Sequence, residues 1–276
     1  MTALDRFDPV TLEELVSQAS LLTRVDRKYA IPRAALAPVL AGLDERTRVL
    51  EIDEARDFAY ESVYFDTPDL LSFRMAAQPR RRRFKLRTRS YLDTGSSYLE
   101  IKTRGARGTT VKERGEYDPD RRDELTPDAR DDVADAFTTI GLASERAHEL
   151  DATLMTRYRR ATLLSPDRAA RATIDTGLEW IEPDGHGFAL PELVIVETKS
   201  GSSASDVDRL LWRAGHRPAT VSKYATGLAA LHPDLPRNRW MRLLRGPFAD
   251  DHRSAPNPTH PNDPTRMEDA SCSVAA

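Results

Sequence analysis

The sequence predicts an α+β protein, an antiparallel eight-stranded tunnel-like β-barrel with helices packed outside. Strands dominate the expected elements, and charged residues alternate with apolar ones along the most regular of them. Because side chains alternate between the two faces of a strand, such a sheet has one charged face and one apolar face. A sandwich would hide apolar side chains between its sheets, whereas a barrel with a wet lumen and helices outside accommodates both faces.

The first third of the chain alternates between helical and extended patterns. Thr11 and Glu14 form a capping box ahead of an apolar stripe, so a helix is expected over 11–22. Residues 24–31 alternate as a strand, and Pro32 then begins a helix over 33–43. Further expected elements are strands at 46–52 and 58–66 and a short apolar element at 70–73.

Residues 80–117, here called the cationic meander, form the segment around which the barrel is organised. Its first run alternates four cations with apolar or small residues, and after a break at 93–97 two further extended runs follow. The cations that the alternation places on one face are Arg83, Lys85, Arg87, Arg89, Lys102, Arg104, Lys112 and Arg114. The expected structure is three charged strands joined by turns.

Charge in this chain is segregated rather than spread. From Arg80 to Arg114 there are twelve Lys and Arg against three Asp and Glu, a net charge of +9, whereas the whole chain is at -3. Like charges this dense repel one another across strands, and a bound polyanion would relieve the repulsion. The alternative is a solvated sheet face, but such faces normally mix charges of both signs.

The remaining elements follow the same rules. Thr126 and Pro127 begin a helix over 127–140, and a short connection is expected at 142–148. The other expected strands are 154–164, 169–175 with 178–182 as its hairpin partner, and 193–199, and the last helices are 205–214 and 222–231. We therefore expect one domain over 1–245, followed by a disordered tail over 246–276 that is rich in Pro, Asp, Asn and Ser.

Composition excludes several classes of protein. The 276 residues are 39% apolar, and the only cysteine, Cys272, lies in the polar tail, so no disulfide partner is expected and a reducing cytoplasm is favoured. No apolar run approaches membrane-spanning length, and the N-terminus has no signal pattern. The near-neutral net charge argues against a general nucleic-acid binder.

Glu197 is the candidate metal ligand. It ends an apolar run of four residues and is followed two positions later by Lys199. A carboxylate among many cations suits Mg²⁺ or Mn²⁺ bridging phosphate oxygens, because such metals often take only one or two protein carboxylates. The simpler interpretation is a surface ion pair at a strand end. Glu100 and Lys102 form a similar pair with a structural or orienting role.

Ser222 and Lys223 open the last expected helix. One interpretation is a helix N-cap followed by an exposed lysine. The other is a phosphate held at the helix N-terminus with Lys223 beside it. Nucleotide-binding glycine loops, the zinc protease motif and a kinase catalytic loop are absent from the sequence, and its six histidines show no ligand spacing.

Nine short motifs, in order over about residues 5–235, resemble the VTC domain, the polyphosphate polymerase domain of the vacuolar transporter chaperone complex within the triphosphate tunnel metalloenzymes. They are Arg24-x-Asp-Arg-Lys28-Tyr29, Tyr64-Phe-Asp66, Lys85-x-Arg87-x-Arg89, Glu100-Ile-Lys102, Lys112-x-Arg114, Tyr158-x-Arg160, Arg171-x-Thr-x-Asp175, Glu197-x-Lys199 and Ser222-Lys223-Tyr224. The Glu-x-Glu-x-Lys opening of the adenylate cyclase and thiamine triphosphatase branch is absent, and Lys28 stands in the first strand instead. The chain resembles the stand-alone bacterial form.

The resemblance implies an enzyme that transfers the γ-phosphoryl group of ATP to a growing inorganic polyphosphate chain inside a tunnel. It implies that Glu197 takes Mn²⁺ or Mg²⁺ and that Arg87, Arg89, Lys199, Ser222 and Lys223 bind the nucleotide. The cations it places in the tunnel are Lys28, Lys85, Arg87, Arg89, Lys102, Lys112, Arg114, Arg160, Arg171, Lys199 and Lys223. The alternatives are a triphosphatase on the same tunnel and a non-catalytic polyphosphate-binding or nucleic-acid-binding module. By analogy alone, a separate membrane protein at the inner face of the membrane would receive the polymer.

Overall fold

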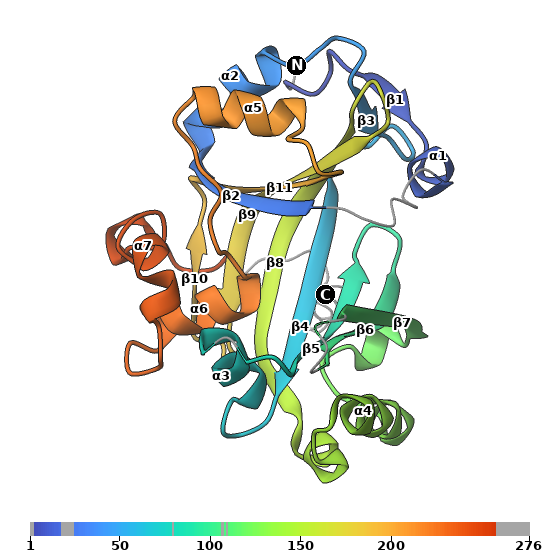
Figure 1. Cartoon of the computed structure of the whole chain (residues 1–276), viewed down its shortest axis with the longest axis vertical. Coiled ribbons are helices and arrows are strands. Elements are labelled where there is room, and N and C mark those ends of the chain that lie inside the picture. Colours follow the sequence, from blue (N-terminus) through green and yellow to red (C-terminus); the bar gives the residue numbers. More distant parts are fainter. Residues whose placement is uncertain (1–2, 18–24, 79, 106–107, 109, 258–276) are drawn as a thin grey trace, which may run out of the picture.

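The fold is an antiparallel sheet with helices on both of its faces (Figure 1). The computed structural model describes residues 3–17, 25–78, 80–105, 108 and 110–257. Eight antiparallel strands form the main path of an 11-stranded sheet, in the order β2-β11-β9-β8-β4-β5-β6-β7. They are β2 (Val25–Pro32), β11 (Leu193–Ser200), β9 (Ala170–Ile181), β8 (Asp151–Leu164), β4 (Phe58–Asp66), β5 (Arg83–Tyr91), β6 (Ser96–Arg104) and β7 (Thr110–Tyr117). The α+β class and the eight antiparallel strands are confirmed.

The expected closure of the barrel by strand pairing is wrong. Strands β2 and β7 are the two ends of the path and do not pair with each other within the described residues. β7 carries charges on both of its faces and is almost entirely exposed, which suits an edge strand that resists pairing. The segment 219–223 lies against the other edge instead, where the backbone N–H of Ala219 donates to the carbonyl oxygen of Lys28 over 2.7 Å.

Helices cover the apolar face of the sheet, as predicted. α4 (Pro127–Ile140) packs on Phe84 and Leu86 of β5, and Phe137 of this helix contacts Phe84 with ring centroids 4.5 Å apart. α2 (Leu36–Ala41) and α5 (Asp206–Arg213) pack on apolar residues of β2, β8, β9 and β11. Along β5 the buried residues alternate with half-buried cations, so the cationic run faces away from these helices.

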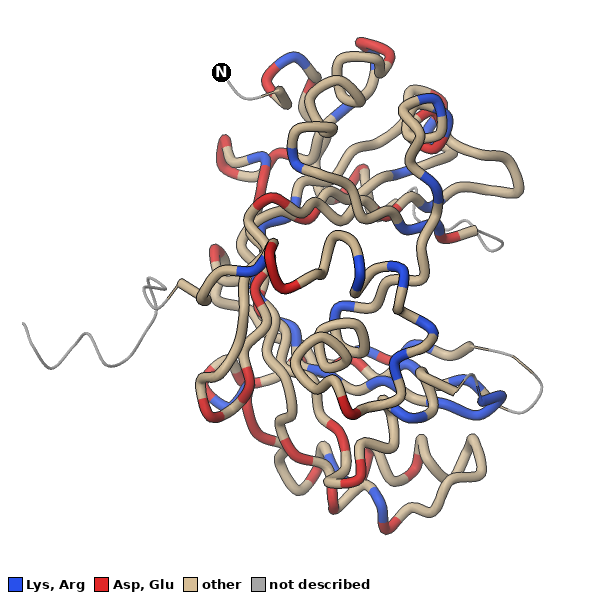
Figure 2. Tube along the Cα trace, turned by 90° about the vertical axis from the view of Figure 1, so that its left-hand side faces the viewer, with Lys and Arg blue, Asp and Glu red and all other residues tan. Residues whose placement is uncertain are grey.

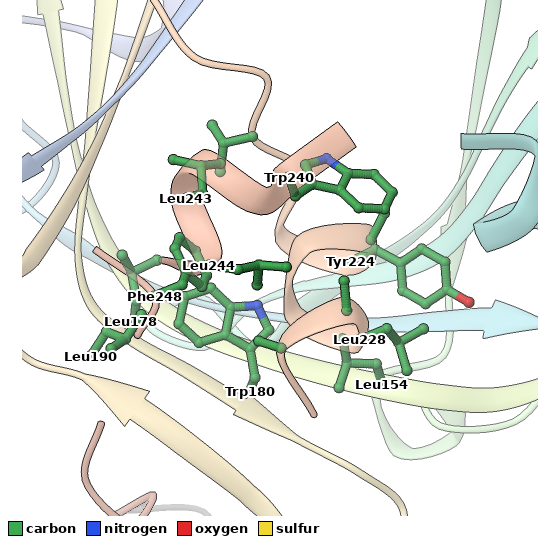
Figure 3. Close-up of a cluster of buried hydrophobic side chains, with 14 of the residues drawn as sticks. Leu154, Leu178, Trp180, Leu190, Tyr224, Leu228, Trp240, Leu243, Leu244 and Phe248 are labelled. Atoms are coloured by element: carbon green, nitrogen blue, oxygen red, sulfur yellow. The ribbon is translucent and has the colours of Figure 1, made fainter. Parts of the chain in front are cut away.

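Two further helices cover part of the opposite face. α6 (Lys223–Leu231) and α7 (Met241–Leu244) pack on Trp180, Leu178 and Leu154 (Figure 3). Gly227 allows this approach, because a Cβ built on it would lie 2.2 Å from a ring carbon of Trp180. α3 (Leu71–Ala77) joins the same cluster through Phe73. One end of this face is therefore apolar and covered.

Several element boundaries differ from the prediction. Strand β9 is continuous from Ala170 to Ile181, and its hairpin partner is β10 (Gly187–Leu190) rather than 178–182. Gly177, at φ +58°, lies opposite a register shift that keeps the strand unbroken, because glycine adopts this backbone conformation without strain. Expected strand 46–52 shortens to β3 (Arg48–Leu50), which pairs with β1 (Asp8–Val10) and β8.

The helix boundaries also shift. Residues 33–35 form a 3-10 turn ahead of α2, which tolerates Pro38 in its first turn. Expected element 70–73 is the start of α3. α1 (Leu12–Ser17) begins as predicted, but residues 18–22 of the expected helix lie outside the described residues. Other 3-10 turns are Pro119–Arg121, Ser144–Glu149, Asn238–Trp240 and Asp250–His252.

The expected disorder from Gly246 is wrong for residues 246–257. Phe248 is fully buried, with its ring centroid 5.2 Å from that of Trp180. Arg253 donates to the carbonyl oxygens of Phe248 and Ala230, and Ser254 pairs with Ala189 through both backbone groups. A buried aromatic ring, together with the hydrogen bonds of Arg253 and Ser254, thus anchors an otherwise polar segment. Residues 258–276, including Cys272, lie outside the described residues.

Candidate functional site

Strand register places ten of the eleven predicted tunnel cations on one face of the sheet, here called the cationic face, and Lys223, at the start of α6, reaches the same face through its ion pair with Asp175. Directly paired residues project to the same side, and Lys85 pairs with Lys102, which pairs with Lys112. In the other half of the sheet, Lys199 pairs with Arg171. Figure 2 shows Lys and Arg gathered along the strands of the cationic meander. The cations therefore face one another across a curved sheet rather than pointing toward the covering helices α2, α4 and α5.

Glu100 holds three of these cations in place. Its carboxylate, with a side chain 4% exposed, accepts from Arg87 Nη2 over 2.6 Å and from Lys112 Nζ over 3.0 Å, and lies 3.7 Å from Arg89. Burial alone would raise the pKa of Glu100, but the charges of these cations hold its pKa well below the ordinary value. The expected orienting role of Glu100 thus fits its position, with Arg87 as its closest partner.

Asp175 holds two further cations, Arg160 and Lys223, on the other side of the cationic face. Its place in a family motif was the only prediction made for it from the sequence. Its side chain is 1% exposed, receives both Nε and Nη2 of Arg160 at 2.6 and 2.8 Å, and pairs with Lys223. Burial acts to raise the pKa of Asp175, and Arg160 and Lys223 outweigh it and keep the carboxyl ionised. The signal in the sequence was its spacing of four from Arg171, which puts both on one face.

Lys85, Ser222 and Lys223 connect β5 to the start of α6. Ser222 is the N-cap of α6, and its Oγ also accepts from Lys85 Nζ over 2.9 Å. Lys223 is not the exposed lysine of the simpler interpretation, because its side chain is 11% exposed and its Nζ lies 4.0 Å from the ring centroid of Tyr158. Burial lowers the pKa of both lysines, and neighbouring cations lower that of Lys85 further.

Glu197 lies on the same face between two lysines. Its Oε2 is 3.5 Å from Lys28 Nζ, its other oxygen contacts Lys199, and Lys199 is also 3.8 Å from Asp26. Within the described part of the chain, no group of three or more His, Cys, Asp and Glu is arranged to hold a metal. This donor set therefore fits only a hard divalent cation that draws its remaining ligands from phosphate oxygens and water.

One row across the face contains polar groups with no partner. Six buried side-chain polar atoms lack a hydrogen bond in the described residues, and three of them are Arg89 Nε, Ser62 Oγ and Thr156 Oγ1. Ser62 pairs directly with Arg89 on one side and with Thr156 on the other, so the three atoms belong to one cross-strand row. Buried polar groups are normally satisfied, and ligand oxygens or water would satisfy these.

The remaining predicted residues lie toward the edges of the site. Lys102, Lys112 and Arg114 are exposed near β7, and the side chain of Lys112 is 51% exposed. Arg171 and Lys199 lie at the opposite end, on β9 and β11. Sequence reasoning gave no site role to Tyr60, Tyr64 and Tyr158, although Tyr64 and Tyr158 stand in two of the family motifs. All three lie between the cations, and Arg87 donates to the Tyr64 hydroxyl over 3.2 Å. The available signal was the spacing of four between Tyr60 and Tyr64 in β4, and the position of Tyr158 two residues before Arg160 in β8.

No helix of the described residues has the length and apolar character that a membrane span requires. No curated protein sequence matches the chain. Among solved structures, a candidate adenylyl cyclase from Hippeastrum, whose description gives a dominant triphosphatase activity, is 16% identical with a TM-score of 0.47 and covers 75% of this chain and 96% of its own. A candidate adenylate cyclase from Vibrio parahaemolyticus is 13% identical with a TM-score of 0.41, covering 75% and 98%.

The sequence itself identifies the family. Residues 23–232 match the model of the VTC domain, and this span contains the whole cationic face. It also contains every strand of the main path of the sheet. The chain belongs to the VTC domain family.

Proposed function

We propose that this protein is a polyphosphate polymerase that transfers the γ-phosphoryl group of ATP to the end of an inorganic polyphosphate chain with the help of Mn²⁺ or Mg²⁺. One observation carries the proposal. Eleven cations share one face of the sheet, and the carboxylates that pair with them, Asp26, Glu100, Asp175 and Glu197, are too few to neutralise them. A multiply charged anion on this face would supply the missing charge.

The residues would act by positioning and by neutralising charge. Arg89 has an unused donor at Nε, and Ser62 and Thr156 beside it have unused hydroxyl groups, so this row suits phosphate oxygens. Asp175 orients Arg160 and Lys223, and Glu100 orients Arg87, so these cations are held ready before substrate binds. Preorganised donors of this kind stabilise the charge that develops during phosphoryl transfer.

The transfer itself needs no protein nucleophile. A terminal phosphate oxygen of the acceptor chain attacks the γ-phosphorus, the bond from this phosphorus to the β–γ bridging oxygen breaks, and ADP leaves with the bond electrons. The acceptor oxygen is already an anion at neutral pH, so no general base is required. Glu197 would hold the divalent metal, which supplies further neutralisation of the phosphate oxygens.

The decisive experiment incubates the purified protein with ATP and Mn²⁺ and resolves the products on a gel. A ladder of phosphate polymers is expected, and a parallel reaction with Mg²⁺ tests the choice of metal. Phosphate alone would instead show a triphosphatase, in which water takes the place of the chain end. Tight binding of polyphosphate without turnover would show a binding module.

The variant Glu197→Gln tests the role of the metal ligand separately from that of the cations that bind phosphate. This variant keeps the size of the side chain and loses its charge, so we expect metal-dependent turnover to fall sharply while polyphosphate still binds. Full turnover by the variant would remove Glu197 as the metal ligand. For the cellular context we propose a cytoplasmic protein that hands its polymer to a separate membrane protein, which co-purification from membranes would test.

A further inference from the structure

Four tyrosines form a continuous row across the cationic face, here called the tyrosine row. Tyr158 stacks on Tyr60 with ring centroids 5.3 Å apart and planes 9° apart. Tyr60 contacts Tyr91 at 4.9 Å, and Tyr91 meets the edge of Tyr98 at 5.8 Å. The row therefore runs from β8 in the centre of the sheet through β4 and β5 to β6, next to the edge strand β7.

The two ends of the row differ in their surroundings. Tyr158 is buried, and Tyr60 packs against the apolar clusters of the core. Tyr91 and Tyr98 are half-buried and belong to none of the four apolar clusters found among the described residues. Core packing therefore explains the inner end of the row and leaves the outer end without a structural role.

A planar cation covers the outer end. The guanidinium carbon of Arg114 lies 3.6 Å from the ring centroid of Tyr98 and 5.6 Å from that of Tyr91, and its Nη2 donates to the Tyr91 hydroxyl over 3.3 Å. Arg114 is exposed, so this contact can be exchanged at little cost. A flat group stacked on an accessible ring occupies the position that a nucleobase takes on aromatic side chains.

We propose that Tyr98 and Tyr91 form a base subsite for a nucleoside triphosphate, whose base stacks on Tyr98 where the Arg114 guanidinium now lies. The inference rests on the proposed function for the triphosphate part of the ligand. Arg114, displaced from the ring, is then available to a phosphate oxygen. Because every base has a π-face, the subsite accepts ATP and GTP alike and holds pyrimidine nucleotides less tightly.

The cross-strand row of Arg89, Ser62 and Thr156, whose buried polar atoms have no partner, lies in a position that supports this arrangement. Arg89, whose Nε has no partner, is paired directly with Tyr98 across β5 and β6. Side chains that face each other in this way are about 5 Å apart at Cβ. A nucleotide with its base on Tyr98 therefore has its phosphates beside Arg89 and Arg87.

The test compares binding of ATP and of inorganic tripolyphosphate by isothermal titration calorimetry. Loss of one stacked base costs about 1–3 kcal/mol, so Tyr98→Leu is expected to weaken ATP binding about tenfold or more and to leave tripolyphosphate binding unchanged. Tyr98→Phe keeps the ring and should keep the affinity for ATP. Val111→Ala, an exposed site on β7 away from the ring, serves as the matched control.

A second measurement reports stacking directly. The fluorescence of ethenoadenosine triphosphate should be quenched on binding to the wild type and to Tyr98→Phe, but not on binding to Tyr98→Leu. Equal weakening of both ligands by Tyr98→Leu, or no weakening of ATP, would overturn the base subsite. Failure of the wild type to bind tripolyphosphate would instead overturn the proposed function, and the subsite with it.

Discussion

The two faces of the sheet treat buried charge in different ways. On the face covered by α5, Asp208 is fully buried and accepts from the Tyr29 hydroxyl over 2.7 Å and from Thr198 Oγ1 over 2.6 Å, with Arg27 at 3.4 Å. Also on the helix-covered face, Glu61 accepts from Arg122 and Arg157 at 2.7 and 2.9 Å. Each of these carboxylates is matched locally by donors on the elements that it joins.

On the cationic face, the cations outnumber the carboxylates that pair with them. Arg89 keeps an unused buried donor, and burial together with neighbouring cations lowers the pKa of Lys85. A protein that needed only stability would pair such groups or replace them with apolar residues. We therefore infer that charge stabilises the fold on one face and binds a ligand on the other.

The largest effect is expected for Arg89→Ala. Removing one preorganised donor to a transition state typically costs about 10²–10³ in rate. Arg89 lies 3.7 Å from Glu100 and 5.9 Å from the ring centroid of Tyr60, and both are long contacts, so stability should change little. Turnover of ATP and thermal unfolding of the same preparation measure the two quantities. If the variant unfolds at a lower temperature and its folded fraction is fully active, Arg89 stabilises the fold and does not act on the substrate.

Asp208→Ala should give the opposite result on the other face. It leaves Arg27 and the hydroxyls of Tyr29 and Thr198 without their buried acceptor, so a loss of about 3–5 kcal/mol in unfolding free energy is expected. Denaturant titration gives this value. Activity per folded molecule should match that of the wild type, and a loss of turnover without loss of stability would contradict a purely structural role for Asp208.

Lys85→Met should stabilise the ligand-free protein. The ammonium group is buried among Lys28, Arg87, Lys102 and Lys223, so an apolar side chain of similar length should raise the unfolding free energy by about 1 kcal/mol. The stabilisation that tripolyphosphate gives to the wild type should shrink in this variant. Destabilisation by Lys85→Met would mean that the contact with Ser222 outweighs the repulsion.

The smallest effect is the dependence of ligand binding on pH. The pKa values of Lys85 and Lys223 in the folded protein lie below the ordinary 10.5. Between the folded-state pKa and 10.5 the unfolded chain therefore binds more protons than the folded protein, so the ligand-free protein gains stability as pH rises through this range. Anion binding has the opposite sign, because it requires protonated lysines.

The affinity for tripolyphosphate should therefore fall several-fold as pH rises from neutral toward 10.5. Calorimetric titrations at constant ionic strength across this range would measure it. Lys85→Arg keeps its charge throughout and should lose less affinity. An affinity that stays constant in the wild type would show that neither lysine contacts the ligand.

The sequence alone determined which residues share a face and to which family the chain belongs. Alternation along a strand is a local property, so the cations of β5, β6 and β11 could be placed together before any contact was known. The order of short motifs identified the VTC domain for the same reason, because seven of the nine motifs lie within a single strand.

Only the tertiary structure decided how the face is completed. The pairing of Asp175 with Lys223, the contact of Lys85 with Ser222 and the stacking of Arg114 on Tyr98 join different elements. The open edge between β2 and β7 and the anchoring of Phe248 on Trp180 were likewise invisible to local patterns. These contacts depend on how the sheet curves and on where the helices pack, and a local pattern of residues carries neither.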